Sequence, residues 1–93
     1  MSTATIIKKI RPILNRYGVK RAALFGSAAR GKIKNNSDVD VLVEIPQDVT
    51  LLDFIGIKIA LEKALAKKVD LVEYKTLKSA IRKNVLKERV PIL

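Results

Sequence analysis

The chain contains no cysteine and no histidine. Without cysteine it forms neither disulfide bonds nor thiolate metal sites, which is the usual condition of a cytoplasmic protein. Without histidine it also lacks the ligands of ordinary zinc sites and the commonest acid–base catalyst. Any catalysis by this chain therefore has to use carboxylates, cations and a hard metal ion.

Long apolar runs and aromatic side chains are scarce as well. No apolar run approaches the roughly 18 residues that a membrane-spanning helix needs, and the N-terminal Met-Ser-Thr-Ala-Thr lacks the basic and apolar regions of a signal peptide. We therefore expect a cytoplasmic protein that does not enter a membrane. Two tyrosines and two phenylalanines are too few for the base-stacking platform of a single-strand nucleic-acid binder.

Positive charge, by contrast, is abundant. The chain carries 19 lysines and arginines against 9 acidic residues, a net charge of +10. This excess favours a polyanion or an acidic protein as partner, although lysine-rich surfaces are also common in small soluble proteins. Nucleic acid is therefore a candidate partner, but one that the shortage of aromatic residues does not favour. With 93 residues, 48% of them apolar, the sequence predicts a single domain over residues 1–93.

Hydrophobic periodicity predicts alternating helices and strands. Residues 90–93 form an apolar tail, which is expected either to pack on the core or to bind a partner. The expected helices are 3–17, 50–66 and 77–88, the expected strands are 19–25, 39–45 and 69–74, and a polar loop is expected at 32–37. The second helix has a wide apolar face, expected to pack on the sheet or another helix, made of Leu51, Leu52, Phe54, Ile55, Ile59, Leu61 and Leu65.

A turn and two acidic residues stand out between the first two strands. Gly26-Ser27 ends the first strand, and backbone N–H groups in such a turn can bind a phosphate. Ser27 is expected to cap a short helical turn. Asp38 and Asp40 open the next strand, where residues two apart share one face. Paired carboxylates can hold Mg²⁺ against a phosphate, so this stretch has the parts of a nucleotide site.

Two short motifs carry a family resemblance. They are Gly26-Ser27-x-x-Arg30-Gly31 and Ser37-Asp38-x-Asp40, the second followed by an apolar strand. Together they resemble the signature of the minimal nucleotidyltransferases (MNT) of the polymerase-beta-like nucleotidyltransferase superfamily, and the order of predicted elements fits as well. The resemblance implies an α/β nucleotidyltransferase fold, with a small mixed sheet of about three strands and about four helices. It also implies that strands 19–25 and 39–45 are antiparallel neighbours.

The resemblance further implies a two-metal site for Mg²⁺. Asp38 and Asp40 would bind the metal ions. Asp70, at the start of the third predicted strand, matches the third acidic residue of the family. It would act on the attacking hydroxyl as a base or as a further metal ligand. Glu73 is a weaker alternative, because a residue three positions along a strand faces the other side.

The phosphates of the nucleotide, ATP, are expected at the turn. Gly26 and Ser27 would present N–H groups and a hydroxyl to them. Arg30 either reaches the triphosphate or holds the loop, and Ser37 is a hydroxyl beside the metal site. Nucleotidyl transfer depends on positioning and charge neutralisation more than on covalent catalysis, which suits a chain without histidine or cysteine.

Among small members of the family, the chain resembles the MntA-type antitoxins of type VII HEPN/MNT toxin–antitoxin modules. The resemblance implies a protein adenylyltransferase that moves AMP from ATP to a tyrosine of a HEPN-domain toxin and thereby silences it. Two alternatives stay open: an antitoxin that neutralises its toxin by binding alone, and a nucleotidyltransferase that acts on RNA or a small molecule. A homodimer or a larger complex with the toxin is a further expectation, with the tail 90–93 as a candidate contact.

Overall fold

Helices and strands alternate as the sequence predicts, with ends that differ by one or two residues. The computed structural model describes residues 1–31, 33 and 37–93. Within these ranges no helix has the length and apolar character needed to cross a membrane. The helices are α1 (Thr3–Arg16), α2 (Gly26–Ala29), α3 (Leu51–Leu65) and α4 (Ser79–Glu88), with a 3₁₀ turn η1 (Tyr74–Thr76), and the strands are β1 (Arg21–Phe25), β2 (Val39–Glu44), β3 (Val69–Glu73) and β4 (Val90–Pro91).

In the described part of the chain, four strands form one mixed sheet in the order β3-β2-β1-β4. β1 runs antiparallel to β2, as predicted, and β3 runs parallel to β2. The prediction of about three strands misses β4, which the apolar tail forms at the edge of the sheet. Pro91 lies opposite Ala23 of β1, and the N–H of Ile92 donates to the carbonyl of Ala22 at 2.8 Å. Proline is tolerated there because an edge strand pairs on one side only.

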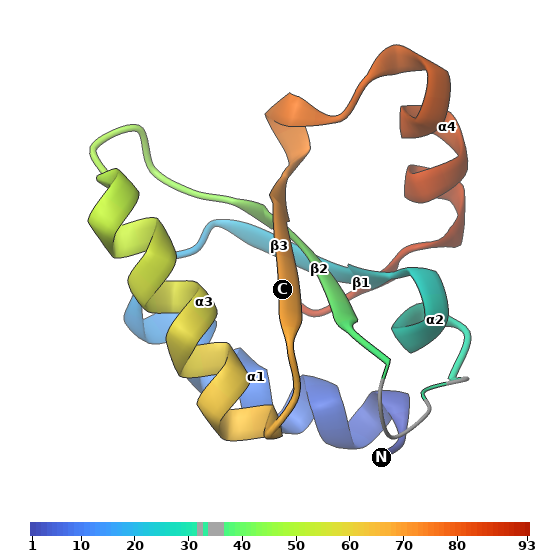
Figure 1. The fold of residues 1–93 in the computed structure, drawn as a ribbon. Helices are drawn as coiled ribbons and strands as arrows, with labels where there is room; N and C mark the ends of the chain where they lie inside the picture. Colours follow the sequence, from blue (N-terminus) through green and yellow to red (C-terminus); the bar gives the residue numbers. More distant parts are fainter. Residues whose placement is uncertain (32, 34–36) are drawn as a thin grey trace.

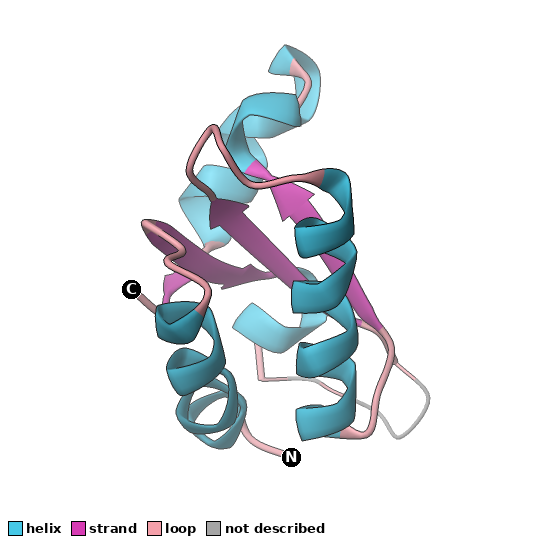
Figure 2. Cartoon of the chain, turned by 90° about the vertical axis from the view of Figure 1, so that its left-hand side faces the viewer, coloured by secondary structure: helices cyan, strands magenta, loops and turns pink. Residues whose placement is uncertain are grey.

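The sheet separates two layers of helices. α1 and α3 lie side by side on one face, and α4 lies on the other (Figure 1 and Figure 2). Residues of β2 alternate between the faces. Val41 belongs to the core beneath α1 and α3, whereas Leu42 belongs to a smaller cluster with Val85 of α4. The even-numbered residues of β2 therefore face the α4 side.

Three aliphatic residues fix α1 on the sheet. Ile6, Ile10 and Leu14 recur every four residues and are fully buried, as the predicted stripe requires. The helix begins after Ser2, whose hydroxyl accepts a hydrogen bond from the Thr5 N–H at 3.1 Å. The sequence pattern alone therefore accounts for the start and the orientation of this helix.

α3 begins at a capping box, but its packed face is not the expected one. Thr50 and Asp53 each accept a hydrogen bond from the other's backbone N–H. The buried side chains are Ile57, Leu61 and Leu65. Four apolar side chains that were expected on the packed face are exposed instead: Leu51, Leu52, Ile55 and Ile59. The expectation fails because apolar residues occur on several sides of α3, between its charged residues, so periodicity does not select one face.

Candidate active site

Two of the predicted acidic residues lie side by side on neighbouring strands. Asp40 on β2 and Asp70 on β3 are partners in the parallel register, and adjacent strands lie about 4.8 Å apart. Asp40 points to the α4 side of the sheet, because its neighbours Val39 and Val41 are buried on the opposite side. Asp40 is half-buried and Asp70 is exposed, while Asp38 is exposed just before β2. The fold thus brings carboxylates together from distant parts of the chain.

The effect of this crowding is seen at Asp40. Burial raises the pKa of the Asp40 carboxyl above its ordinary value of 3.8, and the negative charges of Asp70 and then Asp38 raise it further. The positive charge of Arg30 opposes part of this rise in the pKa. A cation bound between these carboxylates would relieve their mutual repulsion.

Gly26 lets the backbone pass directly beside the Asp40 carboxylate. Phe25, the last residue of β1, pairs with Asp40 across the sheet, so the following turn begins next to that side chain. Gly26 has a φ of +64°, and a Cβ atom there would overlap with Asp40 Oδ2. Ser27, half-buried, is the second residue of α2. The prediction that Ser27 caps α2 is wrong, because the helix begins one residue earlier without a side-chain cap.

Arg30 connects the short helix α2 to α4. Its Nη1 atom lies 3.2 Å from Oε2 of Glu88, and both side chains are about half exposed. At the other side of α2, Thr3 donates a hydrogen bond to the carbonyl of Ala28 at 2.6 Å, which links α2 to α1. Sequence reasoning missed Glu88 and Thr3, since partners so far apart leave no spacing signal. A contact between Arg30 and a nucleotide stays a prediction.

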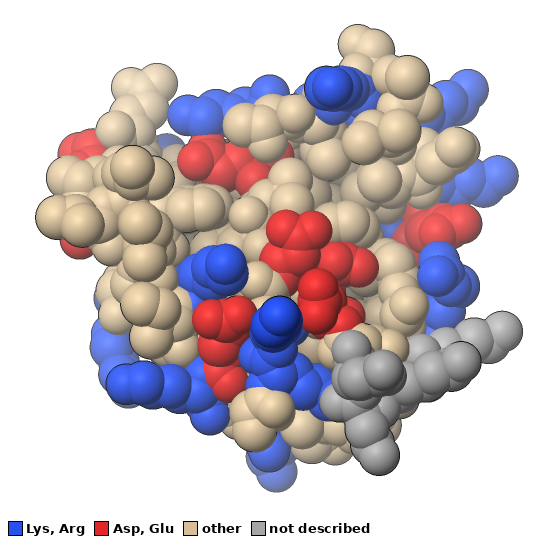
Figure 3. Space-filling view, in the orientation of Figure 1, with Lys and Arg blue, Asp and Glu red and all other residues tan. Residues whose placement is uncertain are grey.

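The oxygen ligands around Asp40 suit Mg²⁺ without forming a complete cage. In the ranges that the structure describes, no three acidic side chains converge closely enough to hold a metal ion by themselves. Mg²⁺ commonly uses one or two protein carboxylates and completes its shell with phosphate oxygens and water. Binding of Mg²⁺ by Asp38, Asp40 and Asp70 together with the phosphates of a nucleotide stays a prediction. Acidic side chains gather near the middle of the face in Figure 3, with basic ones around them.

Ser37 is half-buried and lies two residues before β2. Its place next to Asp38 follows from the chain, and a contact with a nucleotide stays a prediction. Most of the polar loop expected at 32–37 lies outside the described residues.

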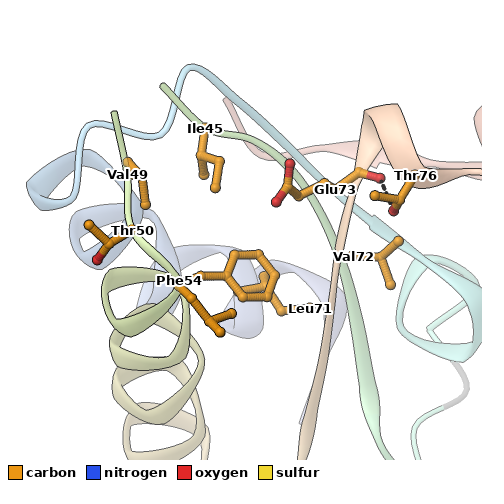
Figure 4. Close-up of a pocket in the computed structure, with 9 residues that line it drawn as sticks. Ile45, Val49, Thr50, Phe54, Leu71, Val72, Glu73 and Thr76 are labelled. Carbon is orange, nitrogen blue, oxygen red and sulfur yellow. Dashed lines mark hydrogen bonds between the residues drawn. The ribbon is translucent and has the colours of Figure 1, made fainter. Parts of the chain in front are cut away.

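A separate hollow lies at the other end of β2 and β3. It has a volume of about 470 Å³ and lies between the start of α3 and the end of β3 (Figure 4). Glu73, the weaker candidate for the third carboxylate, lines this hollow and pairs with Lys75 at 3.3 Å. Asp70 is therefore the acidic residue of β3 that lies beside Asp40. The lining residues are Ile45, Val49, Thr50, Leu51, Phe54, Leu71, Val72, Glu73 and Thr76.

Comparison with known proteins relates most of the chain to one family. Residues 7–92 match the family model of the nucleotidyltransferase domain. Protein adenylyltransferase MntA of Thermococcus cleftensis is 44% identical over 80 residues, which are 86% of this chain and 81% of that protein. A Methanocaldococcus jannaschii protein, MJ0435, is provisionally named a protein adenylyltransferase. It is 42% identical over 93 residues, 100% of both chains.

Solved structures share the fold. One, described provisionally as a minimal nucleotidyltransferase, matches with a TM-score of 0.85 and 36% identity over 98% of this chain and 96% of that chain. A complex of a tri-AMPylated Shewanella oneidensis HEPN toxin with MNT antitoxin contains a chain that matches with a TM-score of 0.74. That match has 19% identity over 98% of this chain and 71% of that chain, and it shows a common fold alone.

Proposed function

Because the chain belongs to the nucleotidyltransferase domain family, we propose that it transfers AMP from ATP, with Mg²⁺, to a tyrosine hydroxyl of a HEPN-domain toxin. It acts in this way as the antitoxin of that toxin. The relative named protein adenylyltransferase MntA supports the reaction type. The shared fold with a chain from a complex of MNT antitoxin and AMPylated HEPN toxin supports the partner.

The observation that carries the proposal is the meeting of Asp40, Asp70 and Gly26. The strand pair places the two carboxylates side by side, and the glycine brings the backbone against one of them. Burial and neighbouring charges raise the pKa of Asp40, so its ionised form is unfavourable in the folded chain. Such crowding is more typical of binding and catalytic sites than of structural ones.

The acidic residues would bind the metal ions and accept the proton of the attacking hydroxyl. Asp38 and Asp40 would hold the metal ions, and Asp70 would act as a base or as a further ligand. When bound there, Mg²⁺ would neutralise phosphate charge and lower the pKa of a hydroxyl that it contacts. With Asp70 as base, its carboxylate takes the hydroxyl proton while the hydroxyl oxygen bonds to the α-phosphorus of ATP. The bond from that phosphorus to the bridging oxygen breaks, and pyrophosphate leaves.

The residues of the turn position the nucleotide. Gly26 and Ser27 offer N–H groups and a hydroxyl to the phosphates, and Ser37 adds a second hydroxyl beside the metal ions. Arg30 already lies close enough for its charge to act on Asp40. Arg30 can therefore turn from its ion pair on α4 to the triphosphate, where its guanidinium can bind phosphate oxygens.

Labelled ATP tests the proposal. We expect the chain, incubated with Mg²⁺, α-labelled ATP and a candidate HEPN-domain partner, to label that protein. The double variant Asp38→Asn, Asp40→Asn should lose at least about 100-fold in rate, since it removes the charges that bind metal. Asp48→Asn is the matched control, because this acidic residue is exposed on a turn outside the site. Chelation of Mg²⁺ should abolish the labelling.

Other outcomes would select the alternatives. Neutralisation of the toxin without any label transfer, retained in the double variant, would contradict the enzymatic proposal and indicate an antitoxin that works by binding. Label that appears on RNA or on a small molecule, and not on the protein, would identify a different acceptor.

A further inference from the structure

The short helix α2 begins at the turn that is proposed to bind the phosphates, but it has little of its own to hold it in place. It spans Gly26–Ala29, and its N-cap residue is Phe25, whose side chain has no hydrogen-bond acceptor to offer. Helices shorter than about 12 residues are marginal by themselves. The buried side chain of α2 is Ala28, which covers little apolar surface. The position of α2 therefore depends on contacts with other elements.

Polar contacts tie α2 to α4 and to α1. On the α4 side, Arg30 pairs with Glu88, but both side chains are about half exposed, and exposed ion pairs commonly contribute little. On the α1 side, the hydroxyl of Thr3 donates to the Ala28 carbonyl at 2.6 Å, and this hydrogen bond is partly buried. Since water competes less for a partly buried hydrogen bond, the contact with Thr3 is the stronger of the two.

Thr3 is not needed to begin the helix in which it lies. Ser2 is the N-cap residue of α1, and its hydroxyl accepts the hydrogen bond from the Thr5 N–H. Threonine is also a poorer helix former than alanine. The hydroxyl of Thr3 instead contacts a carbonyl that lies 25 residues away along the chain.

The Ala28 carbonyl marks the point at which α2 ends. It also accepts the N–H of Gly31 at 3.3 Å, and the N–H of Arg30 donates to the Gly26 carbonyl at 3.3 Å. A Cβ atom at Gly31 would lie 3.6 Å from Thr3 Oγ1. The hydroxyl of Thr3 thus lies beside both Ala28 and Gly31, where the chain leaves α2.

We propose that Thr3 is a positioning residue for nucleotide binding, because its hydrogen bond to Ala28 holds the end of α2. The start of α2 is fixed by the sheet, since Phe25 pairs with Asp40. Ser27 lies between these two fixed points. Its hydroxyl and the neighbouring N–H groups are thereby kept in one orientation beside the carboxylates, and such preorganisation favours binding. The effect on ATP rests on the proposed function, whereas the effect on α2 does not.

Hydrogen exchange tests the hold of Thr3 on α2 without any nucleotide. Thr3→Val keeps the shape of the side chain and removes the donor. The amides of Arg30 and Gly31, which close α2, should then exchange roughly 3–10-fold faster. Thr3→Ser keeps a donor and should restore the slower exchange. Unchanged exchange in Thr3→Val would overturn the proposal, whether or not the chain binds ATP.

Calorimetric titration with ATP and Mg²⁺ tests the consequence for the nucleotide. Thr3→Val should raise the Kd of ATP roughly 3–10-fold, and Thr3→Ser should keep the wild-type value. In the transfer assay the KM for ATP should rise by a similar factor, while kcat stays within about twofold. A general loss of stability would not produce this division between KM and kcat.

Ile10→Val is the matched control for stability. Ile10 is fully buried in α1, about two turns beyond Thr3, so its truncation destabilises the same helix and leaves the contact with Ala28 intact. This variant should keep the wild-type exchange in α2 and the wild-type Kd. Equal changes in Ile10→Val and Thr3→Val would overturn the proposal. Faster exchange in Thr3→Val with an unchanged Kd would overturn its nucleotide part, and a wild-type chain that does not bind ATP would overturn the proposed function as well.

Discussion

Among single residues, Asp40 holds an unfavourable charge. Because burial, Asp70 and Asp38 raise its pKa, the ionised carboxylate destabilises the folded chain relative to the unfolded one. We expect Asp40→Asn to raise the melting temperature at neutral pH without metal, because it removes the unfavourable charge, while it removes activity. Thermal unfolding followed by circular dichroism measures the difference, with Asp48→Asn as the exposed control. A lower melting temperature for Asp40→Asn would contradict the account.

The pH dependence of this difference has a defined sign. The folded-state pKa of Asp40 lies above its ordinary value of 3.8. As pH falls, the folded chain takes up this proton before the unfolded chain does, which stabilises the wild type. The advantage of Asp40→Asn should therefore shrink as pH falls through the folded-state pKa of Asp40 toward 3.8.

Alanine variants at Gly26 and Gly18 distinguish the cost of a left-handed backbone conformation from the cost of a side-chain overlap. Both glycines have positive φ, +64° and +73°, but a Cβ atom overlaps with Asp40 Oδ2 only at Gly26, while at Gly18 it meets nothing within 4 Å. Gly18→Ala should cost about 1–2 kcal/mol for the left-handed conformation alone. Gly26→Ala should cost clearly more and should also reduce nucleotidyl transfer. Urea unfolding of both variants measures the two costs, and equal values would contradict the predicted overlap.

The candidate site shows which residues a sequence can indicate. Asp38 and Asp40 stand out because two acidic residues that are two positions apart occur at the start of a predicted strand, where this spacing favours one face. Asp70 could be selected only through the family resemblance, since its pairing with Asp40 depends on the register of two strands that are distant in sequence. Glu88, the partner of Arg30, gave no signal, because only the tertiary fold brings α4 to α2.

At the scale of elements, the C-terminal tail contributes through one buried side chain directly after β4. Ile92 is 4% exposed and belongs to the main core, next to the short edge strand. We expect Ile92→Ala to lower the free energy of unfolding by about 2–4 kcal/mol, through lost burial and a cavity. Ile81→Ala on exposed α4 should change it by about 0.5 kcal/mol or less. Equal effects in chemical denaturation would show that the tail does not pack on the core.

α3 offers a test of the unused space at Gly56. Gly56→Ala should raise the free energy of unfolding by roughly 0.5–1 kcal/mol, since alanine is the better helix former and a Cβ atom there meets only the Tyr17 hydroxyl at 3.9 Å. Chemical denaturation measures the effect, and a destabilised variant would show that the glycine serves the packing of the chain itself.

The elements differ in how far the sequence predicts them. α1 could be predicted with its buried face, because its apolar residues form one stripe on an otherwise polar helix. The packed face of α3 could not be predicted, since the apolar residues of that helix are not confined to one side. β4 was missed because a two-residue strand that ends in Pro91 has no periodicity, and its partner β1 lies far away in the sequence.

In the whole molecule, the sheet separates a surface with acidic residues from a surface with exposed apolar residues. The side with α4 carries the crowded carboxylates and the turn at Gly26, where we propose that the nucleotide binds. The side with α1 and α3 carries the exposed apolar side chains of α3. A contact on the second surface therefore leaves the first free for a nucleotide and an acceptor protein.

The intact mass of the acceptor protein tests the central claim most directly. A candidate HEPN-domain partner should gain the mass of one or more AMP groups after incubation with the chain, ATP and Mg²⁺. It should gain none with the Asp38→Asn, Asp40→Asn variant. An unchanged acceptor mass with the wild-type chain, under conditions in which the toxin is neutralised, would contradict the claim that this site transfers AMP to a protein.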